Sequence, residues 1–229
     1  MADPVTAPVF LVLLPLLGSI LAFLLPRGRA VCGVAIAGGN LALVINAVFQ
    51  LIEVGSWQHQ VGGWGAPLGI DLYFDGLSAV MLVMTGLAAS SISVYSTAYF
   101  TAAAARHFWP LWLLLLAAMN ALFLSRDLFN LYVTLELVGI AAVSLTAMRG
   151  QRAALVAAMR YLLATLLGSM AYLLGVALLY HSTGSVDIGL VGKADVPGSV
   201  AVVAFAAMVT GLLLKTALFP FHFWLPAAH

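Results

Sequence analysis

Charged residues are scarce in this sequence. Only 7% of its 229 residues are Asp, Glu, Lys or Arg, whereas 64% are hydrophobic. A soluble globular domain carries about 25% charged residues. This chain lacks the polar side chains that a water-facing surface needs, and its net charge of +1 argues against nucleic acid as a partner. The composition therefore predicts an integral protein of the lipid bilayer.

Cysteine and the common cofactor motifs are also scarce or missing. Cys32 is the only cysteine, which excludes an internal disulfide and an iron–sulfur cluster held by cysteines. There is no G-x-G-x-x-G and no P-loop, and the spacing of His222 and His229 across a proline is not a zinc spacing. We expect no cofactor, no metal and no redox site. The sequence leaves open whether the chain belongs to an enzyme complex.

Long apolar segments dominate what is present. Seven of them are long enough to cross a membrane as helices, at about 5–25, 31–53, 77–100, 109–125, 127–148, 154–181 and from about 200 onward. The connection at 54–74 is polar and rich in glycine, and its Gly-Gly and Ala-Pro dipeptides predict a short surface hairpin. The sequence therefore predicts an all-α polytopic membrane protein with about seven spans.

The seventh segment does not end like an ordinary helix. Pro220 and Pro226 follow Lys215, and each proline removes a backbone donor and interrupts a helix. Unwound backbone at membrane depth is tolerated only where it is buried in protein or lines a cavity, and broken helices mark ion sites in transporters. We predict that the seventh span is interrupted just after Lys215.

Lysine and arginine are distributed unevenly between the two ends of the predicted spans. Two of them, Arg126 and Lys193, lie on one side; the other side holds Arg27, Arg29, Arg106, Arg149, Arg152 and Arg160. Because basic residues accumulate on the cytoplasmic side, the N-terminus, the 54–74 connection and the 182–199 loop are predicted to lie outside. The expected location is the bacterial cytoplasmic membrane.

Two charged side chains, Glu136 and Lys215, lie deep within apolar spans. A charge at the bilayer centre costs about 2.5–3.5 kcal/mol on insertion scales, so the pair predicts a proton-transfer or ion site. The alternatives are a purely structural Glu136 and a Lys215 whose long side chain reaches the interface. His222 is a candidate relay, because free imidazole titrates at about pH 6.5, with an interfacial histidine as the alternative.

Other residues are assigned structural roles. Asp127 is expected to cap the fifth helix. Arg160 is expected to anchor the sixth span at the cytoplasmic side. Gly168, Ser169 and Gly175 are small, and small residues allow helices in membranes to pack closely.

Four stretches carry a resemblance to a known family. The two specific ones are DLFNLYVTLELVGI and LLLKTALFPFHFWLPAAH, and the others are GGWGAPLGIDLYFDGLSAVMLVMTGL and MRYLLATLLGSMAYLLGVALLYHSTGSVDI. The chain resembles the N-terminal half of the proton-translocating antiporter-like family. This family includes the D component of Mrp-type Na+/H+ antiporters, the antiporter-like membrane subunits of complex I (NADH:quinone oxidoreductase), and membrane subunits of energy-converting hydrogenases.

The resemblance implies roles for specific residues and a domain plan. Glu136 and Lys215 match the key glutamate and lysine of the family, and His229 matches a family histidine and is a second candidate relay. Family members contain two inverted repeats, of which this chain would hold one. Residues 1–107 would form helices one to three, and residues 108–229 would form helices four to seven, the first and incomplete repeat. The second repeat is missing and the chain reads LPAAH where many relatives read LPDAH, so we do not expect a complete proton path within this chain alone. The end at His229, without a charged tail, predicts a partial chain, a split gene or a truncated reading frame.

The leading functional prediction is a proton-translocating, cation/proton antiporter-like membrane subunit of an Mrp-type or complex I/hydrogenase-related complex. Its partners would be other membrane subunits, and protons would move through a buried Glu–Lys relay, with Na+ as a second ion left open. Two alternatives stand beside it: a non-conducting scaffold or truncated fragment, and an autonomous secondary transporter. A solute site needs several convergent polar contacts, which these spans lack.

Overall fold

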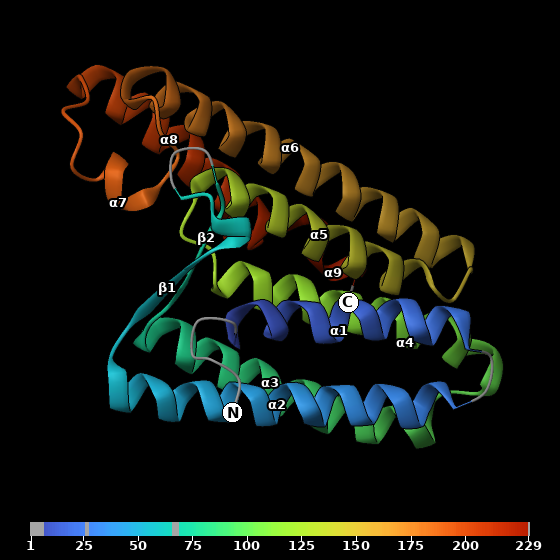
Figure 1. Ribbon diagram of the computed structural model, residues 1–229. Coiled ribbons are helices and arrows are strands. Elements are labelled where there is room, and N and C mark those ends of the chain that lie inside the picture. The colour runs from blue at the N-terminus through green and yellow to red at the C-terminus, as the bar shows by residue number, and fades with distance from the viewer. Residues whose placement is uncertain (1–6, 26–27, 66–68, 229) are drawn as a thin grey trace. The chain divides into compact units, whose positions relative to one another are not determined.

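The computed structural model describes residues 7–25, 28–65 and 69–228, and most of them form long helices (Figure 1). In this part of the chain, six helices are long and apolar enough to cross a membrane: α2 (Arg29–Val54), α3 (Gly76–Tyr99), α4 (Ala102–Phe123), α5 (Leu128–Ala147), α6 (Arg152–Thr183) and α8 (Gly198–Lys215). The shorter apolar helix α1 (Ala7–Leu24) coincides with the first predicted span. The prediction of an all-α polytopic membrane protein is confirmed.

The chain divides into two compact units. The first comprises Met1–Gly62 and Asp71–Ser125, and the second comprises Gly63–Ile70 and Arg126–His229. In the first unit, α4 packs along α1, and α2 packs along α3. This grouping follows spatial contacts and does not test where a sequence repeat begins, so the proposed boundary between residues 107 and 108 stays a prediction.

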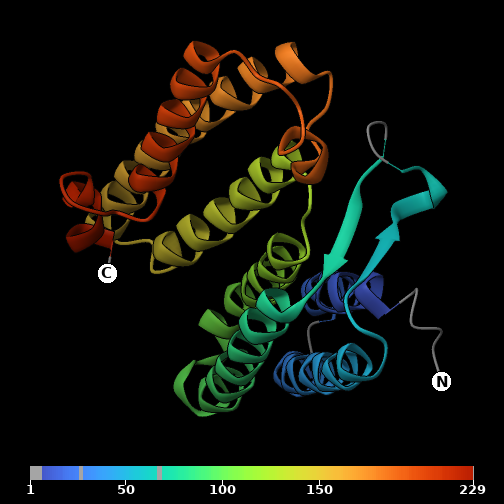
Figure 2. The same ribbon diagram turned by 90° about the vertical axis from the view of Figure 1, so that its left-hand side faces the viewer.

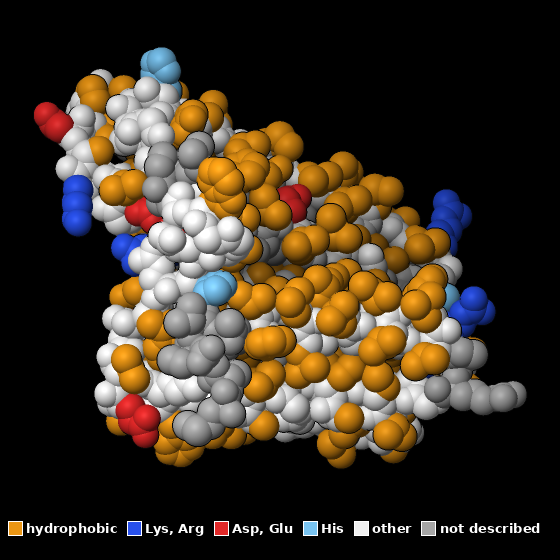
Figure 3. All heavy atoms as spheres, in the orientation of Figure 1, with side chains coloured by type: hydrophobic (Ala, Val, Ile, Leu, Met, Phe, Trp, Pro, Cys, Tyr) orange, Lys and Arg blue, Asp and Glu red, His pale blue; other side chains and the backbone are white. Residues whose placement is uncertain are grey.

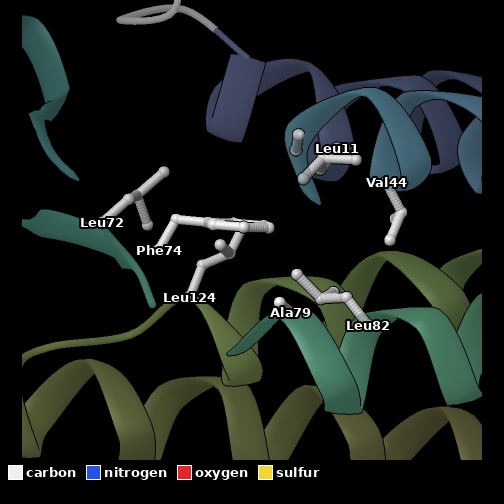
Figure 4. Close-up of a cluster of buried hydrophobic side chains, with 8 residues drawn as sticks. Leu11, Val44, Leu72, Phe74, Ala79, Leu82 and Leu124 are labelled. Carbon is white, nitrogen blue, oxygen red and sulfur yellow. The ribbon is translucent and has the colours of Figure 1, made fainter. Parts of the chain in front are cut away.

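The predicted hairpin is present in the first unit. Strands β1 (Trp57–Gln60) and β2 (Asp71–Phe74) pair antiparallel, with Trp57 opposite Phe74. Their aromatic rings stack with centroids 4.6 Å apart. Figure 4 shows Phe74 in an apolar cluster with Leu72, Leu11, Val44, Ala79, Leu82 and Leu124, and Ala47 belongs to the same cluster. The hairpin is therefore anchored in the core of this unit by one of its strand ends.

A proline in α1 explains a buried polar contact in the same unit. Pro15 has no N–H, so it cannot donate the helical hydrogen bond to the carbonyl of Leu11. The side-chain amide of Asn120 on α4 donates to that carbonyl instead, over 2.7 Å, and also to Oδ1 of Asn40 on α2, over 2.9 Å. Both asparagines are fully buried. One amide group therefore satisfies the freed carbonyl and links three helices.

Replacing Asn120 with leucine is expected to destabilise the first unit by about 1–3 kcal/mol, because buried acceptors lose their donor. Thermal unfolding in detergent would measure the loss. Asn46→Leu is the matched control, since Asn46 is exposed on α2 and its side-chain oxygen accepts from Gln50 of its own helix. Equal unfolding temperatures for the two variants would contradict the role given to Asn120.

The exposed surface is largely apolar. Large hydrophobic side chains are exposed on the described helices, among them Val31 (75%), Phe23 (73%) and Phe205 (70%). In Figure 3, hydrophobic side chains cover the helix faces in view, while most of the charged side chains in this view lie toward the ends of the helices. Soluble proteins rarely expose apolar area on this scale, so lipid or partner subunits must cover it.

Candidate functional site

The candidate site lies within the second unit, where α6 packs against both α5 and α8. Figure 2 shows α6 and α8 running side by side. Small residues permit their close approach: a methyl group added at Gly168 would lie 2.8 Å from the Gly211 carbonyl oxygen, and one at Gly175 would lie 2.5 Å from that of Ala204. The prediction that Gly168 and Gly175 serve close packing is confirmed.

Glu136 and Lys215 form an ion pair in this unit. The Nζ atom of Lys215 lies 2.7 Å from Oε1 of Glu136, although the residues are 79 positions apart in the sequence. The lysine side chain is 8% exposed and the glutamate side chain 20% exposed. Glu136 lies near the middle of α5, and Lys215 is the last residue of α8. The two charges predicted to form a site are thus in direct contact.

The position of Lys215 along α6 indicates its depth. A methyl group at Gly168, near the midpoint of the 32-residue helix α6, would lie 3.5 Å from Cγ of Lys215. Helix α8 therefore ends beside the middle of α6 and not beside one of its ends. A lysine that extended to the interface would be exposed there, whereas this side chain is buried against the carboxylate.

Ser169 is a site residue that sequence reasoning assigned only to packing. Its side chain is fully buried, and its hydroxyl donates to Oε1 of Glu136, the same oxygen that accepts from Lys215. A usable signal was present in the sequence, since Thr165, Ser169 and Tyr172 recur at one-turn spacing on α6 beside the small residue Gly168. Such a polar stripe in an apolar helix indicates a face turned toward a charged partner.

The interruption after α8 is present, as predicted, and it is anchored. The chain turns at Ala217, whose φ of 52° lies in the left-handed region. It then passes through the short helices η2 (His222–Trp224) and α9 (Leu225–Ala228). Trp224 is buried; its ring stacks on Tyr161 of α6 at 4.3 Å, and its Nε1 donates to the Leu214 carbonyl over 3.1 Å. Trp224 therefore caps the end of α8 next to Lys215.

The candidate relay His222 is not joined to the pair. The side chain of His222 is exposed, and its ring stacks on Phe219 with centroids 5.7 Å apart. Between residues 69 and 228, no hydrogen bond or ion pair connects His222 to Glu136 or Lys215. His229 lies outside the described residues. A relay role for either histidine stays a prediction.

The start of α5 is fixed by a second polar cluster. Asp127 caps α5 as predicted, accepting from the Asn130 backbone N–H over 2.6 Å. The backbone of Leu128 donates to Val186 over 2.9 Å, and Arg126 Nε lies 3.5 Å from a carboxylate oxygen of Asp187. Sequence reasoning missed the role of Asp187, which fixes the α6–α8 connection to the beginning of the helix that carries Glu136.

No metal centre is found in the part of the chain that the structure describes: no three residues of His, Cys, Asp and Glu are grouped in a way that could hold an ion. The site therefore consists of one carboxylate, one ammonium and one hydroxyl, with Trp224 behind the helix end. These are proton-exchanging and hydrogen-bonding groups, and they can form, break and shift a buried ion pair.

Comparisons with known proteins find similar membrane subunits. Residues 125–229 match the model of the family described as NADH:quinone oxidoreductase/Mrp antiporter, TM. The chain is 35% identical to NADH-quinone oxidoreductase subunit N of Desulforudis audaxviator, over 97% of this chain and 46% of the relative.

Two solved structures are similar throughout the chain. A chain of the membrane-bound sulfane sulfur reductase, an archaeal respiratory membrane complex, superposes with a TM-score of 0.91 at 27% identity, covering 96% of this chain and 47% of that one. A chain of the Mrp complex from Dietzia sp. gives 0.86 at 28% identity, covering 100% and 44%. The present chain spans less than half the length of each of these three proteins. Residues 125–229 thus match the model of this family, and nearly the whole chain is similar in sequence and in fold to a membrane subunit of an NADH-quinone oxidoreductase and to a chain of an Mrp complex.

Proposed function

We propose that this chain is a proton-translocating membrane subunit of a multi-subunit complex, and that the proton passes through Glu136 and Lys215. The observation that carries the proposal is the buried 2.7 Å ion pair at the end of an interrupted helix. The similar proteins support it, because their names describe a quinone oxidoreductase subunit, an Mrp complex and a respiratory membrane complex. The partners would accordingly be other membrane subunits.

The mechanism depends on the distance between the two charges. While the pair is closed, Nζ of Lys215 lies 2.7 Å from Oε1 of Glu136, and each charge compensates the other. An uncompensated ammonium in an apolar interior is costly. Opening the pair therefore favours release of the proton from Lys215 to a neighbouring acceptor, and closing it favours uptake.

The helix break gives the lysine a means of moving. Lys215 is followed by irregular backbone instead of a further turn of helix, so its position depends on how that segment is held. Trp224 holds it by stacking on Tyr161 and by capping the Leu214 carbonyl. A partner subunit that displaces the segment would change the distance from Lys215 to Glu136 without unfolding α8.

The experiment that tests this function uses the complete assembly containing this subunit. Reconstituted in liposomes with a trapped pH-sensitive dye, the driven assembly should change the internal pH, and a proton carrier should abolish the change. Repeating the measurement with and without sodium determines whether Na+ moves in exchange. An assembly that turns over its driving reaction without moving protons would refute the proposal.

The membrane orientation is a separate prediction. With the N-terminus outside, a cysteine at Gln60 or Leu190 should react with a membrane-impermeant thiol reagent added outside, and a cysteine at Gln151 should not. Gln60 and Gln151 form a matched pair because both are exposed glutamines. The background should be Cys32→Ala, since Cys32 is the only cysteine. Labelling at 151 from outside would reverse the topology.

A further inference from the structure

We infer that Ser169 is a positioning residue for Glu136: its hydroxyl orients the carboxylate toward Lys215 and changes its hydrogen-bond acceptor when the carboxylate gains or loses charge. The functional part of this inference rests on the proposed role of the pair in proton transfer. The structural part concerns the hydroxyl alone and is testable in the isolated chain.

The geometry gives the serine hydroxyl two acceptors. Its oxygen donates to Oε1 of Glu136 and also lies 2.8 Å from the carbonyl oxygen of Thr165, one turn earlier on α6. A serine hydroxyl carries a single hydrogen, so it makes one full bond at a time or divides it between the two. The side chain is fully buried, so these two oxygens are its acceptors.

The hydrogen bonds from Ser169 and Lys215 go to the same carboxylate oxygen of Glu136. Ser169 and Lys215 both donate to Oε1, and no hydrogen bond within residues 69–228 goes to Oε2. Since the glutamate side chain is 20% exposed, its unbonded oxygen is the one available to a proton from outside the pair. Ser169 thus determines which oxygen holds the lysine and which stays accessible.

The choice of acceptor follows the charge of the carboxylate. A hydrogen bond to an ionised group is roughly twice as strong as one between neutral groups, so the hydroxyl donates to Glu136 while the carboxylate is charged. Once Glu136 is protonated, the Thr165 carbonyl is an equivalent acceptor, and serine in a helix readily bonds to the carbonyl four residues earlier. The buried donor is satisfied in both states, so neither carries the penalty of an unpaired hydroxyl.

The neighbouring residue Thr165 provides a matched control. It lies one turn away on the same helix and is buried, but among residues 69–228 its hydroxyl donates to the carbonyls of Tyr161 and Leu162, at 3.0 Å each, and not to Glu136. Thr165→Val therefore removes a buried hydroxyl from α6 without removing a bond to Glu136. Ser169→Thr keeps a hydroxyl at the position of interest.

Infrared spectroscopy of the 229-residue chain in lipid tests the structural part. The difference spectrum between wild type and Glu136→Gln isolates the carboxylate bands of Glu136. We expect Ser169→Ala to shift these bands, Thr165→Val to leave them unchanged, and Ser169→Thr to return them toward wild type. Unshifted bands in Ser169→Ala, or an equal shift in Thr165→Val, would overturn the inference.

Proton translocation by the complete assembly tests the functional part. Ser169→Ala should lower the rate about tenfold, the lower end of the range for losing a hydrogen bond to a charged group, while Thr165→Val should stay within about twofold. Shifted bands with an unchanged rate would overturn the role in transfer. If the wild-type assembly moves no protons, the proposed function fails, and the infrared result still determines whether Ser169 positions Glu136.

Discussion

Replacing Lys215 with methionine is expected to lower proton translocation by the complete assembly more than about a hundredfold, the scale of losing a group that transfers a proton. Glu136→Gln should have the same effect, because the amide neither carries the charge nor exchanges the proton. Both variants should still insert, since each removes a charge from an apolar helix. Dye-based proton flux, normalised to the amount of subunit in the membrane, would measure the loss.

Lys215→Arg is the decisive member of this series. Arginine keeps the positive charge and can pair with Glu136, but its guanidinium does not deprotonate in proteins. We therefore expect an assembled but inactive subunit. If this variant translocates protons at the wild-type rate, proton release from residue 215 is not part of the mechanism and the ion pair is structural.

Stability measurements separate loss of the pair from loss of the fold. Removing one member of a fully buried ion pair costs about 3–5 kcal/mol, and less is expected here because the Glu136 side chain is 20% exposed. The double variant Glu136→Gln/Lys215→Met leaves no uncompensated charge, so it should recover stability without recovering flux. Glu53→Gln and Lys193→Met are surface controls, since both residues are exposed, and they should retain flux.

Replacing Gly168 with leucine is the second change with a large expected effect. The new side chain would meet the Gly211 carbonyl oxygen at 2.8 Å and Cβ of Leu214 at 3.1 Å, so α6 and α8 must separate. Overpacking of this kind costs about 1–3 kcal/mol or more. Because Lys215 lies at the same contact, its ion pair with Glu136 should open and proton flux should be lost. Thermal unfolding and flux would be measured together.

Gly38→Leu is the control for this substitution. Gly38 also lies within a helix, but a Cβ added there would meet nothing within 4 Å, and the position is exposed. A leucine at this position replaces a poor helix former and should be neutral or slightly stabilising. If Gly168→Leu behaved like Gly38→Leu in both measurements, the close approach of α6 and α8 would not hold the ion pair in place.

The long helices could be predicted from the sequence because a membrane span has a required length and apolarity. The predicted spans 77–100 and 127–148 nearly coincide with Gly76–Tyr99 and Leu128–Ala147. The fourth helix is an instructive difference: its apolar part was placed at 109–125, whereas the helix begins at Ala102. The four alanines before Arg106 form helix readily. Arg106 and His107 after them are polar, so a prediction based on a continuous apolar stretch begins the span only after these two residues.

The site was only partly predictable. Glu136 and Lys215 were identifiable because isolated charges in apolar spans are costly, and the helix break was identifiable from its prolines. The contact between the two residues was not, because it depends on how α5 and α8 are rotated against α6. These helices are apolar on most of their faces, so the sequence pattern does not define that rotation. The hydrogen bond of Ser169 depends on the same rotation, although the polar stripe on α6 was a usable signal for it. The contact of Asp187 with Arg126 depends on how the α6–α8 connection folds back to the start of α5.

The unequal lengths of the two packed helices have a consequence for the surrounding lipid. Helix α6 has 32 residues and is about 48 Å long, whereas α8 has 18 residues and is about 27 Å long. The hydrocarbon core of a bilayer is about 30 Å thick, so α6 must tilt or project into the headgroup layer, whereas α8 ends beside the middle of α6. A change in bilayer thickness is therefore expected to act first on α6, and the contact of α6 with α8 at Gly168 and Gly211 lies beside Lys215.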